Sequence, residues 1–259
     1  MSNLFSLVRN ENMKIFLRIR TLFLIGLVVL ITFLTAIFMK NVLQQAASLS
    51  TMWDFALSSV NLLWIVQVFA VIIAGDIVAS EFSWGTIKLL LIRPATRAKI
   101  LFSKYIAVLF FTWTIMFVLF LSSLLFGLIF FGMGESGPDG LFMFGKVTSM
   151  YCLQFIEILM MVTFAFMIST AFRSSSLSIG LSIFLTFMGK PVVDILHHFH
   201  FAWGKYVLFA NTDLTPYFSG GDPLFPGMSL GFSILMLLVY FILFQALSWF
   251  VFMKRDVSV

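Results

Sequence analysis

Glu157 is the residue whose type and position most clearly point to chemistry, because its carboxylate stands within a long apolar run. A charge at the centre of a membrane costs about 3 kcal/mol on insertion scales, so an acid at that depth is usually functional, paired or protonated. Its candidate hydrogen-bond partners by side-chain type are Gln154, Gln67 and Asn61. We predict that Glu157, Gln154 and Gln67 line the path of a transported substrate. A protonated acid in a structural contact between helices is the equally weighted alternative.

Two further patterns have the residue types of metal or catalytic sites without the context that such sites need. Residues 197–200 read His-His-Phe-His, but a zinc site needs a spaced set of ligands, so we interpret these histidines as interfacial loop residues. Residues 227–231 match the Gly-x-Ser-x-Gly of hydrolases but open an apolar run instead of joining a strand to a helix. The sequence also lacks Gly-x-x-x-x-Gly-Lys-Ser/Thr. We therefore expect no catalytic residue, metal or cofactor in this chain, which is not an enzyme by itself.

The composition excludes a water-soluble protein. Hydrophobic residues make up 61% of the 259 residues and charged residues 10%, and the mean hydropathy is +1.08. One aqueous core could not bury so many apolar side chains, so lipid must surround much of the molecule. The net charge of +5 could indicate a nucleic-acid partner, but the basic residues sort by membrane side, so we predict none.

Six apolar runs are each long enough to cross a hydrocarbon core of about 30 Å as a helix. They are residues 22–39, 55–75, 105–131, 147–172, 177–193 and 228–253. An open β structure would leave unpaired backbone groups in lipid, and the runs lack the alternation of a membrane barrel. We predict an all-α integral membrane protein with six transmembrane helices that form a single domain over residues 1–259.

The segments outside these runs supply an amphipathic N-terminus and a short cap. In residues 1–20, apolar residues recur near helical spacing while Arg9, Glu11 and Lys14 take the polar face, which predicts an interfacial helix on the inner leaflet. A soluble helix packed on cytoplasmic loops is the alternative. Residues 195–227 contain three prolines and several aromatic residues, and we expect an outer cap of short helices or a re-entrant segment.

Lys and Arg are distributed unequally between the two sides of the predicted membrane. Twelve of the 16 lie in segments on one side, and such an excess marks the cytoplasmic side. Both termini are therefore predicted in the cytoplasm, in a multi-pass protein of the plasma membrane. The sequence has no Asn-x-Ser/Thr sequon, which favours a bacterial protein over a glycosylated eukaryotic surface protein.

The loop over residues 76–104 has an unusual pattern for a cytoplasmic segment. Gly85 can form a turn, residues 86–92 can form about two helical turns, and Pro94 ends them. A helix this short is marginal alone, since isolated helices below about 12 residues rarely hold in water. Its apolar side chains form a patch that suits either a protein partner or the lipid interface. They are Trp84, Ile87, Leu90 and Leu91.

This loop resembles that of the type-2 ABC transporter permeases. The shared pattern is an acidic residue, then Gly-Thr-x-Lys-x-Leu-Leu, then Pro-x-x-Arg and a Lys that leads into the third span. In this sequence it consists of Glu81, Gly85, Thr86, Lys88, Leu90, Leu91, Pro94, Arg97 and Lys104. The resemblance implies that the loop is a coupling helix seated on a cytoplasmic ATPase. It implies contacts with that ATPase through Glu81, Trp84, Gly85, Thr86, Ile87, Lys88, Leu90, Leu91, Pro94 and Arg97.

The resemblance also implies an activity. The chain would be the permease subunit of an ATP-driven exporter that moves a hydrophobic or amphipathic substrate, such as a peptide, an antibiotic or a lipid-like molecule, out of the cell. ATP and Mg would be bound by a dimer of a separate ABC ATPase, and a second permease copy or a related chain would complete the channel within the membrane lipid. The alternatives are an immunity or sensor membrane protein and a secondary carrier, which should show paired ionisable residues at the midplane or broken helices.

Overall fold

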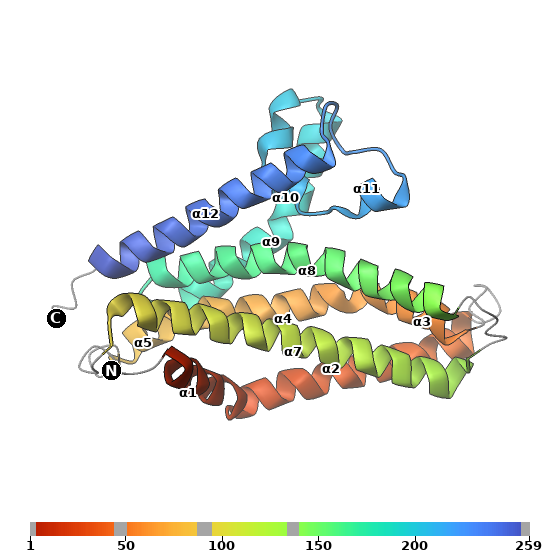
Figure 1. Ribbon diagram of the computed structural model, residues 1–259, viewed down its shortest axis with the longest axis horizontal. Helices are drawn as coiled ribbons and strands as arrows, with labels where there is room; N and C mark the ends of the chain where they lie inside the picture. The colour runs from red at the N-terminus through yellow and green to blue at the C-terminus, as the bar shows by residue number, and fades with distance from the viewer. Residues whose placement is uncertain (1–3, 44–50, 87–94, 134–139, 255–259) are drawn as a thin grey trace. The chain divides into compact units, whose positions relative to one another are not determined.

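The computed structural model describes residues 4–43, 51–86, 95–133 and 140–254, and these residues form helices and turns without a strand (Figure 1). Six helical segments are long and apolar enough to cross a membrane. They span Ile19–Asn41, Met52–Ser83, Arg97–Phe131, Gly140–Ala171, Ser175–His198 and Leu230–Lys254. The prediction of an all-α membrane protein with six transmembrane helices is confirmed.

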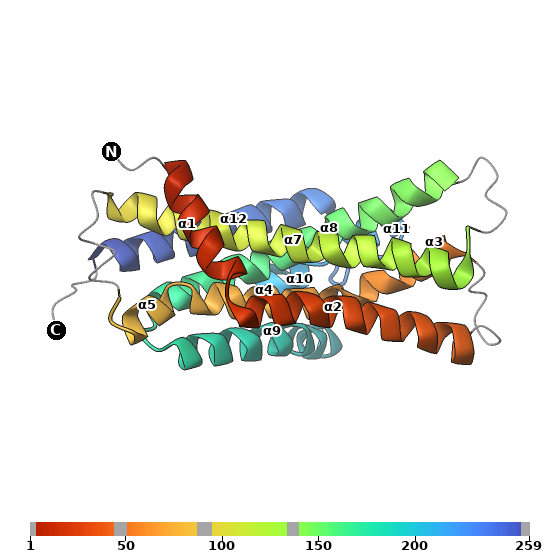
Figure 2. The same cartoon turned by 90° about the horizontal axis from the view of Figure 1, so that it is seen from below.

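The N-terminal helix is separated from the first span by a short break. Helix α1 (Leu4–Phe16) ends before Arg18, which has an extended backbone at ψ 130°, and α2 (Ile19–Phe38) follows it and continues into a π-helical turn (Met39–Leu43). Figure 2 shows α1 and α2 as two separate helices joined by this break.

The second span consists of several consecutive helical segments. It begins with a capping box, in which the Thr51 hydroxyl accepts from the amide of Asp54 and the Asp54 carboxylate accepts from the amide of Thr51. Such reciprocal bonds satisfy amide groups that have no partner inside the helix. The span consists of α3 (Met52–Ser59), a 3-10 turn η2 (Val60–Leu62), α4 (Leu63–Asp76) and α5 (Ala79–Ser83).

The remaining spans are single helices: α7 (Arg97–Phe131), α8 (Gly140–Ala171), α9 (Ser175–His198) and α12 (Leu230–Lys254). Helix α7 has 35 residues, which at 1.5 Å per residue is about 52 Å and therefore longer than a hydrocarbon core of about 30 Å. It must tilt or extend beyond the hydrocarbon.

The chain divides into two compact units. The first unit contains residues 1–12, 70–109 and 153–259, and the second contains residues 13–69 and 110–152. Aromatic side chains hold the second unit together: the Phe33 and Phe126 rings lie 5.3 Å apart, and Phe55 stacks on Phe131 at 5.5 Å. Each such pair adds about 0.5–1.5 kcal/mol to the burial of the rings.

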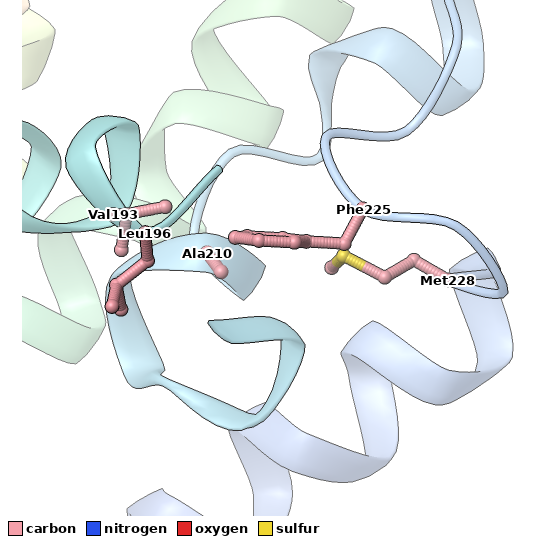
Figure 3. Close-up of a cluster of buried hydrophobic side chains, with 5 residues drawn as sticks. All are labelled: Val193, Leu196, Ala210, Phe225 and Met228. Atoms are coloured by element: carbon pink, nitrogen blue, oxygen red, sulfur yellow. The ribbon is translucent and has the colours of Figure 1, made fainter. Parts of the chain in front are cut away.

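In the first unit, short helices connect α9 to α12. They are the 3-10 turn η3 (Ala202–Tyr206), α10 (Leu208–Asn211) and α11 (Thr215–Ser219). Buried apolar side chains from this segment, from α9 and from the residues before α12 form a small core (Figure 3). They are Val193, Leu196, Ala210, Phe225 and Met228. Because the segment shares its core with the neighbouring spans, it is part of the same unit and not a separate domain.

Candidate functional site

A buried lysine stands at the base of the 76–104 loop. The Lys104 ammonium in α7 donates to the Glu11 carboxylate of α1 at 2.9 Å, to the Glu81 carboxylate of α5 at 3.0 Å and to the Ile77 carbonyl at 3.2 Å. We call Lys104, Glu11, Glu81 and the Ile77 carbonyl the Lys104 cluster. All of it lies in the first unit, so one side chain ties together three segments that are far apart in the sequence.

The Lys104 cluster is shielded from solvent and carries a formal charge of −1. The side chains of Lys104 and Glu11 are 1% and 6% exposed, and that of Glu81 is 12% exposed. Burying a charge is costly, and the cost is recovered only when the geometry is good and the remaining donors are satisfied. Three acceptors match the three N–H donors of the ammonium. The cluster is therefore a buried ionic contact with specific geometry and not a surface ion pair.

The same Glu81 carboxylate also holds the start of the loop. It accepts a hydrogen bond from the Thr86 hydroxyl, while Gly85 between them adopts a positive φ of 70°, which a residue without a Cβ reaches at little cost. Trp84 is 70% exposed. The expected contact residues Glu81, Trp84, Gly85 and Thr86 are thus brought together at the root of the loop.

Of the remaining residues predicted to contact the ATPase, the structure describes one and leaves the others undescribed. Ile87, Lys88, Leu90, Leu91 and Pro94 lie outside the residues that the structure describes. Arg97, at the start of α7, donates from Nη1 to the Met253 carbonyl in the last turn of α12 at 3.2 Å. The last carbonyls of a helix have no hydrogen-bond donor inside the helix. Arg97 supplies such a donor, and its hydrogen bond links the end of α12 to the start of α7.

Serines of α8 and α9 support the break between α4 and α5. The Ser169 hydroxyl, fully buried in α8, accepts from the amides of Val78 and Ala79, both at 3.1 Å. The Ser175 hydroxyl at the start of α9 donates to the buried Asp76 carboxylate at the end of α4. A helix break leaves amide groups without carbonyl partners, and here side chains from neighbouring helices replace them.

Glu157 lies in the middle of α8 and has two partners. Gln154, one turn earlier, donates to it at 2.7 Å, and the Lys190 ammonium of α9 lies 3.6 Å from its other oxygen. Gln67 is buried, but it belongs to the second unit. Asn61 donates to the Ser58 carbonyl of its own helix turn. The structure therefore supplies Glu157 with a nearby cation, Lys190.

The outer histidines pack against aromatic rings. His197 makes an edge contact with Phe225 at 5.5 Å, and His198 makes one with Phe199 at the same distance. Over the described residues, no group of three or more His, Cys, Asp or Glu side chains is arranged to hold a metal ion. His197 and His198 thus take part in aromatic packing at the end of α9.

Sequence reasoning missed the roles of Glu11 and Lys190. Glu11 was expected on the exposed face of an interfacial helix, and this was wrong: it is 5% exposed because its carboxylate binds Lys104. Leu7, Glu11 and Ile15, spaced four residues apart, form the buried face of α1. A lone acid among the basic residues of that helix was the available signal. For Lys190 the signal was weaker, since it stands near the end of an apolar run.

Comparison with known proteins adds a family. A model described as "Protein of unknown function (DUF2705)" matches residues 25–258. The chain belongs to this family. This DUF2705 chain is similar to two proteins of Bacillus subtilis strain 168. It is 44% identical over 220 residues to "Uncharacterized protein YhcI", over 80% of this chain and 70% of that one. It is 33% identical over 247 residues to "Uncharacterized membrane protein YdbK", over 95% of this chain and 100% of that one.

Proposed function

We propose that this DUF2705 chain is the membrane-spanning subunit of an ATP-driven exporter whose ATPase is a separate chain. The observation that carries the proposal is the bridge made by Glu81, whose carboxylate binds Lys104 on one side and Thr86 on the other. The loop with the permease-like pattern therefore starts from a buried charge cluster. A loop that only floated at the lipid surface would not need such a fixed base.

The bridge gives the loop a mechanical role. A partner that pulls on the loop at Trp84 acts on α5, and through Glu81 and Lys104 it acts on α7 and α1. The Ser169 hydroxyl adds α8 to the same assembly. Buried, geometrically matched contacts of this kind move as one body, because breaking them leaves uncompensated charges. ATP binding elsewhere would in this way change which side of the membrane the substrate path faces.

The assembly follows from the resemblance of the loop. Two ATPase subunits would bind ATP and Mg, and this chain would pair with a second copy or a related permease in the plasma membrane of a bacterium, with both termini cytoplasmic. The substrate would be hydrophobic or amphipathic, because the membrane-spanning helices are themselves apolar. Peptides, antibiotics and lipid-like molecules have this character.

Co-purification from native membranes tests the proposal. The full chain carries an affinity tag, and wild type is compared with Trp84→Asp and with a Leu90→Asp, Leu91→Asp double variant. Trp203→Asp is the matched control, because Trp203 is also an exposed tryptophan, at 56%, but lies in the 195–227 cap. We expect a Walker-motif ATPase to accompany wild type and Trp203→Asp and to be lost from both loop variants. If wild type brings down no ATPase, or if the loop variants retain it, the exporter proposal fails.

A secondary carrier is the second candidate. It is favoured by the Glu157–Lys190 pair in the spans and by the break of the second span into α3, η2, α4 and α5, since carriers use paired charges and interrupted helices. An immunity or sensor protein is a third candidate function, and no specific contact in the described residues favours it. Uptake or efflux by proteoliposomes that contain this chain alone, driven by a proton or sodium gradient, would establish the carrier.

A further inference from the structure

We propose that one face of α1 binds anionic phospholipids of the membrane through their phosphate headgroups. This face consists of Phe5, Arg9 and Met13, and we call it the outward face of α1. The proposal goes beyond the exporter and does not depend on it, because lipid binding at α1 can be measured whether or not an ATPase binds the loop.

The outward face is apolar and exposed on both sides of its arginine. Phe5, Arg9 and Met13 follow one another at four-residue spacing, so they lie on one side of the helix. Each precedes a residue of the buried face by two positions, which is about 200° around a helix. Phe5 is 75% exposed and Met13 is 44% exposed. Large apolar side chains on the side turned away from the protein indicate a second apolar environment, and exposed patches of this kind mark membrane or partner contacts.

The charges of this segment are sorted between the same two sides. Glu11 is the only acidic residue among residues 4–20, and its buried carboxylate binds Lys104. The basic residues Arg9, Lys14 and Arg20 are exposed. The segment therefore exposes apolar and basic side chains but buries its one carboxylate. This combination matches an anionic lipid surface, in which apolar chains adjoin a layer of phosphate groups.

The contacts of α1 place it at an end of the membrane spans. Its Glu11 binds the same ammonium as Glu81, and Glu81 lies two residues before Ser83, the last residue of the second span. Lipid headgroups lie at the ends of the spans. A long side chain such as that of Arg9 can lay its stem along apolar surface while its charged end reaches a headgroup phosphate.

Lipid binding at the outward face acts on the Lys104 cluster. Arg9 and Glu11 are two residues apart in one helix, so a headgroup held by Arg9 helps to keep the Glu11 carboxylate at Lys104. A ligand that binds the folded state and not the unfolded state stabilises the folded state. Anionic lipid should therefore raise the melting temperature of the full chain more than a zwitterionic lipid does.

The test measures which lipid lies next to α1. The chain has one cysteine, so a Cys152→Ser background accepts a single label. A bimane fluorophore is attached at Met13→Cys or, as a control, at Ile242→Cys, which is 65% exposed and has no charged residue within four positions. The full chain is placed in nanodiscs of phosphatidylglycerol and phosphatidylcholine in equal parts, and one lipid or the other carries bromine atoms that quench the label.

We expect brominated phosphatidylglycerol to quench the label at position 13 more strongly than brominated phosphatidylcholine does. The difference should correspond to an enrichment of about fivefold, as for one basic residue near an anionic surface. The label at position 242 should be quenched equally by both lipids. Equal quenching by both lipids at position 13 would overturn the anionic preference. If neither lipid quenches the label there, protein and not lipid covers the outward face, and the proposal is also overturned.

Two matched variants isolate the arginine. Arg9→Gln should make quenching at position 13 equal for the two lipids, whereas Lys146→Gln, which removes an exposed basic residue of α8, should leave the difference unchanged. Melting of each variant in the two lipids shows that it is folded and gives a second measurement. Phosphatidylglycerol should raise the melting temperature of wild type and Lys146→Gln but not that of Arg9→Gln. A lipid preference that persists in Arg9→Gln contradicts the proposed headgroup contact.

Discussion

Replacing Lys104 with methionine tests the Lys104 cluster directly. Methionine keeps much of the side-chain length and removes the charge, so the Glu11 and Glu81 carboxylates lose their shared cation. The two oxygens lie 2.9 Å and 3.0 Å from one nitrogen, which places them within about 6 Å of each other. At an effective dielectric constant of about 20, two negative charges at that separation repel by about 3 kcal/mol.

The expected loss of stability follows from this repulsion. Removing one partner of a buried ion pair typically costs about 3–5 kcal/mol, which agrees in size with the unbalanced repulsion. For a chain of this length each kcal/mol lowers the melting temperature by roughly 2–4 °C, so Lys104→Met should melt about 10 °C below wild type. Melting is followed in detergent by the fraction of chain that remains monodisperse on size exclusion after heating.

The control removes the carboxylates as well. Lys104→Met combined with Glu11→Gln and Glu81→Gln leaves a neutral cluster, and replacing buried charges together is often close to neutral for stability. This triple variant should regain most of the lost melting temperature, which a loss of packing alone would not allow. A melting temperature for Lys104→Met within about 2 °C of wild type would refute the reasoning.

The remaining predictions concern packing in the first unit. Ser169→Ala leaves the buried Val78 and following amides without an acceptor, and should lower stability by about 1–3 kcal/mol in the same heating assay, with Ser169→Thr as the variant that retains a hydroxyl. Gly189→Ala places a Cβ 2.1 Å from the Phe209 ring and should cost about 1–3 kcal/mol. Gly180→Ala in the same helix meets nothing within 4 Å and should be neutral or stabilising, and equal behaviour of the two alanines would contradict the packing.

The spans could be predicted from the sequence because lipid imposes a simple rule. A segment that crosses the hydrocarbon must bond its own backbone and carry about 20 apolar residues, so composition and length suffice. The same rule does not locate breaks within a span. The division of the second span depends on acceptors supplied from elsewhere, such as Ser169 for the amides of Val78 and Ala79, and a hydropathy pattern does not contain that information.

Charged residues were harder to place than apolar ones. Lys104 was recognised as part of the loop pattern, but its partner Glu11 lies 93 residues away and has the periodicity of a polar surface residue. Lys190 lies within the predicted run 177–193, and its place in the sequence does not show that it meets Glu157 on another helix. In both cases the ion pair is a tertiary contact, and residue type alone does not specify which opposite charge will meet it.

Helix α8 links the neighbourhood of the Lys104 cluster to Glu157. Near the loop, its Ser169 holds the start of α5, and one to two turns further its Thr163 bonds to the hydroxyl of Tyr105, the residue after Lys104, at 2.8 Å. Six residues beyond Thr163, about 9 Å along the helix, stands Glu157. All these contacts lie in the first unit, and a helix is stiff over this distance. In the proposed exporter, a displacement of the Lys104 cluster would be passed to Glu157 through this one helix.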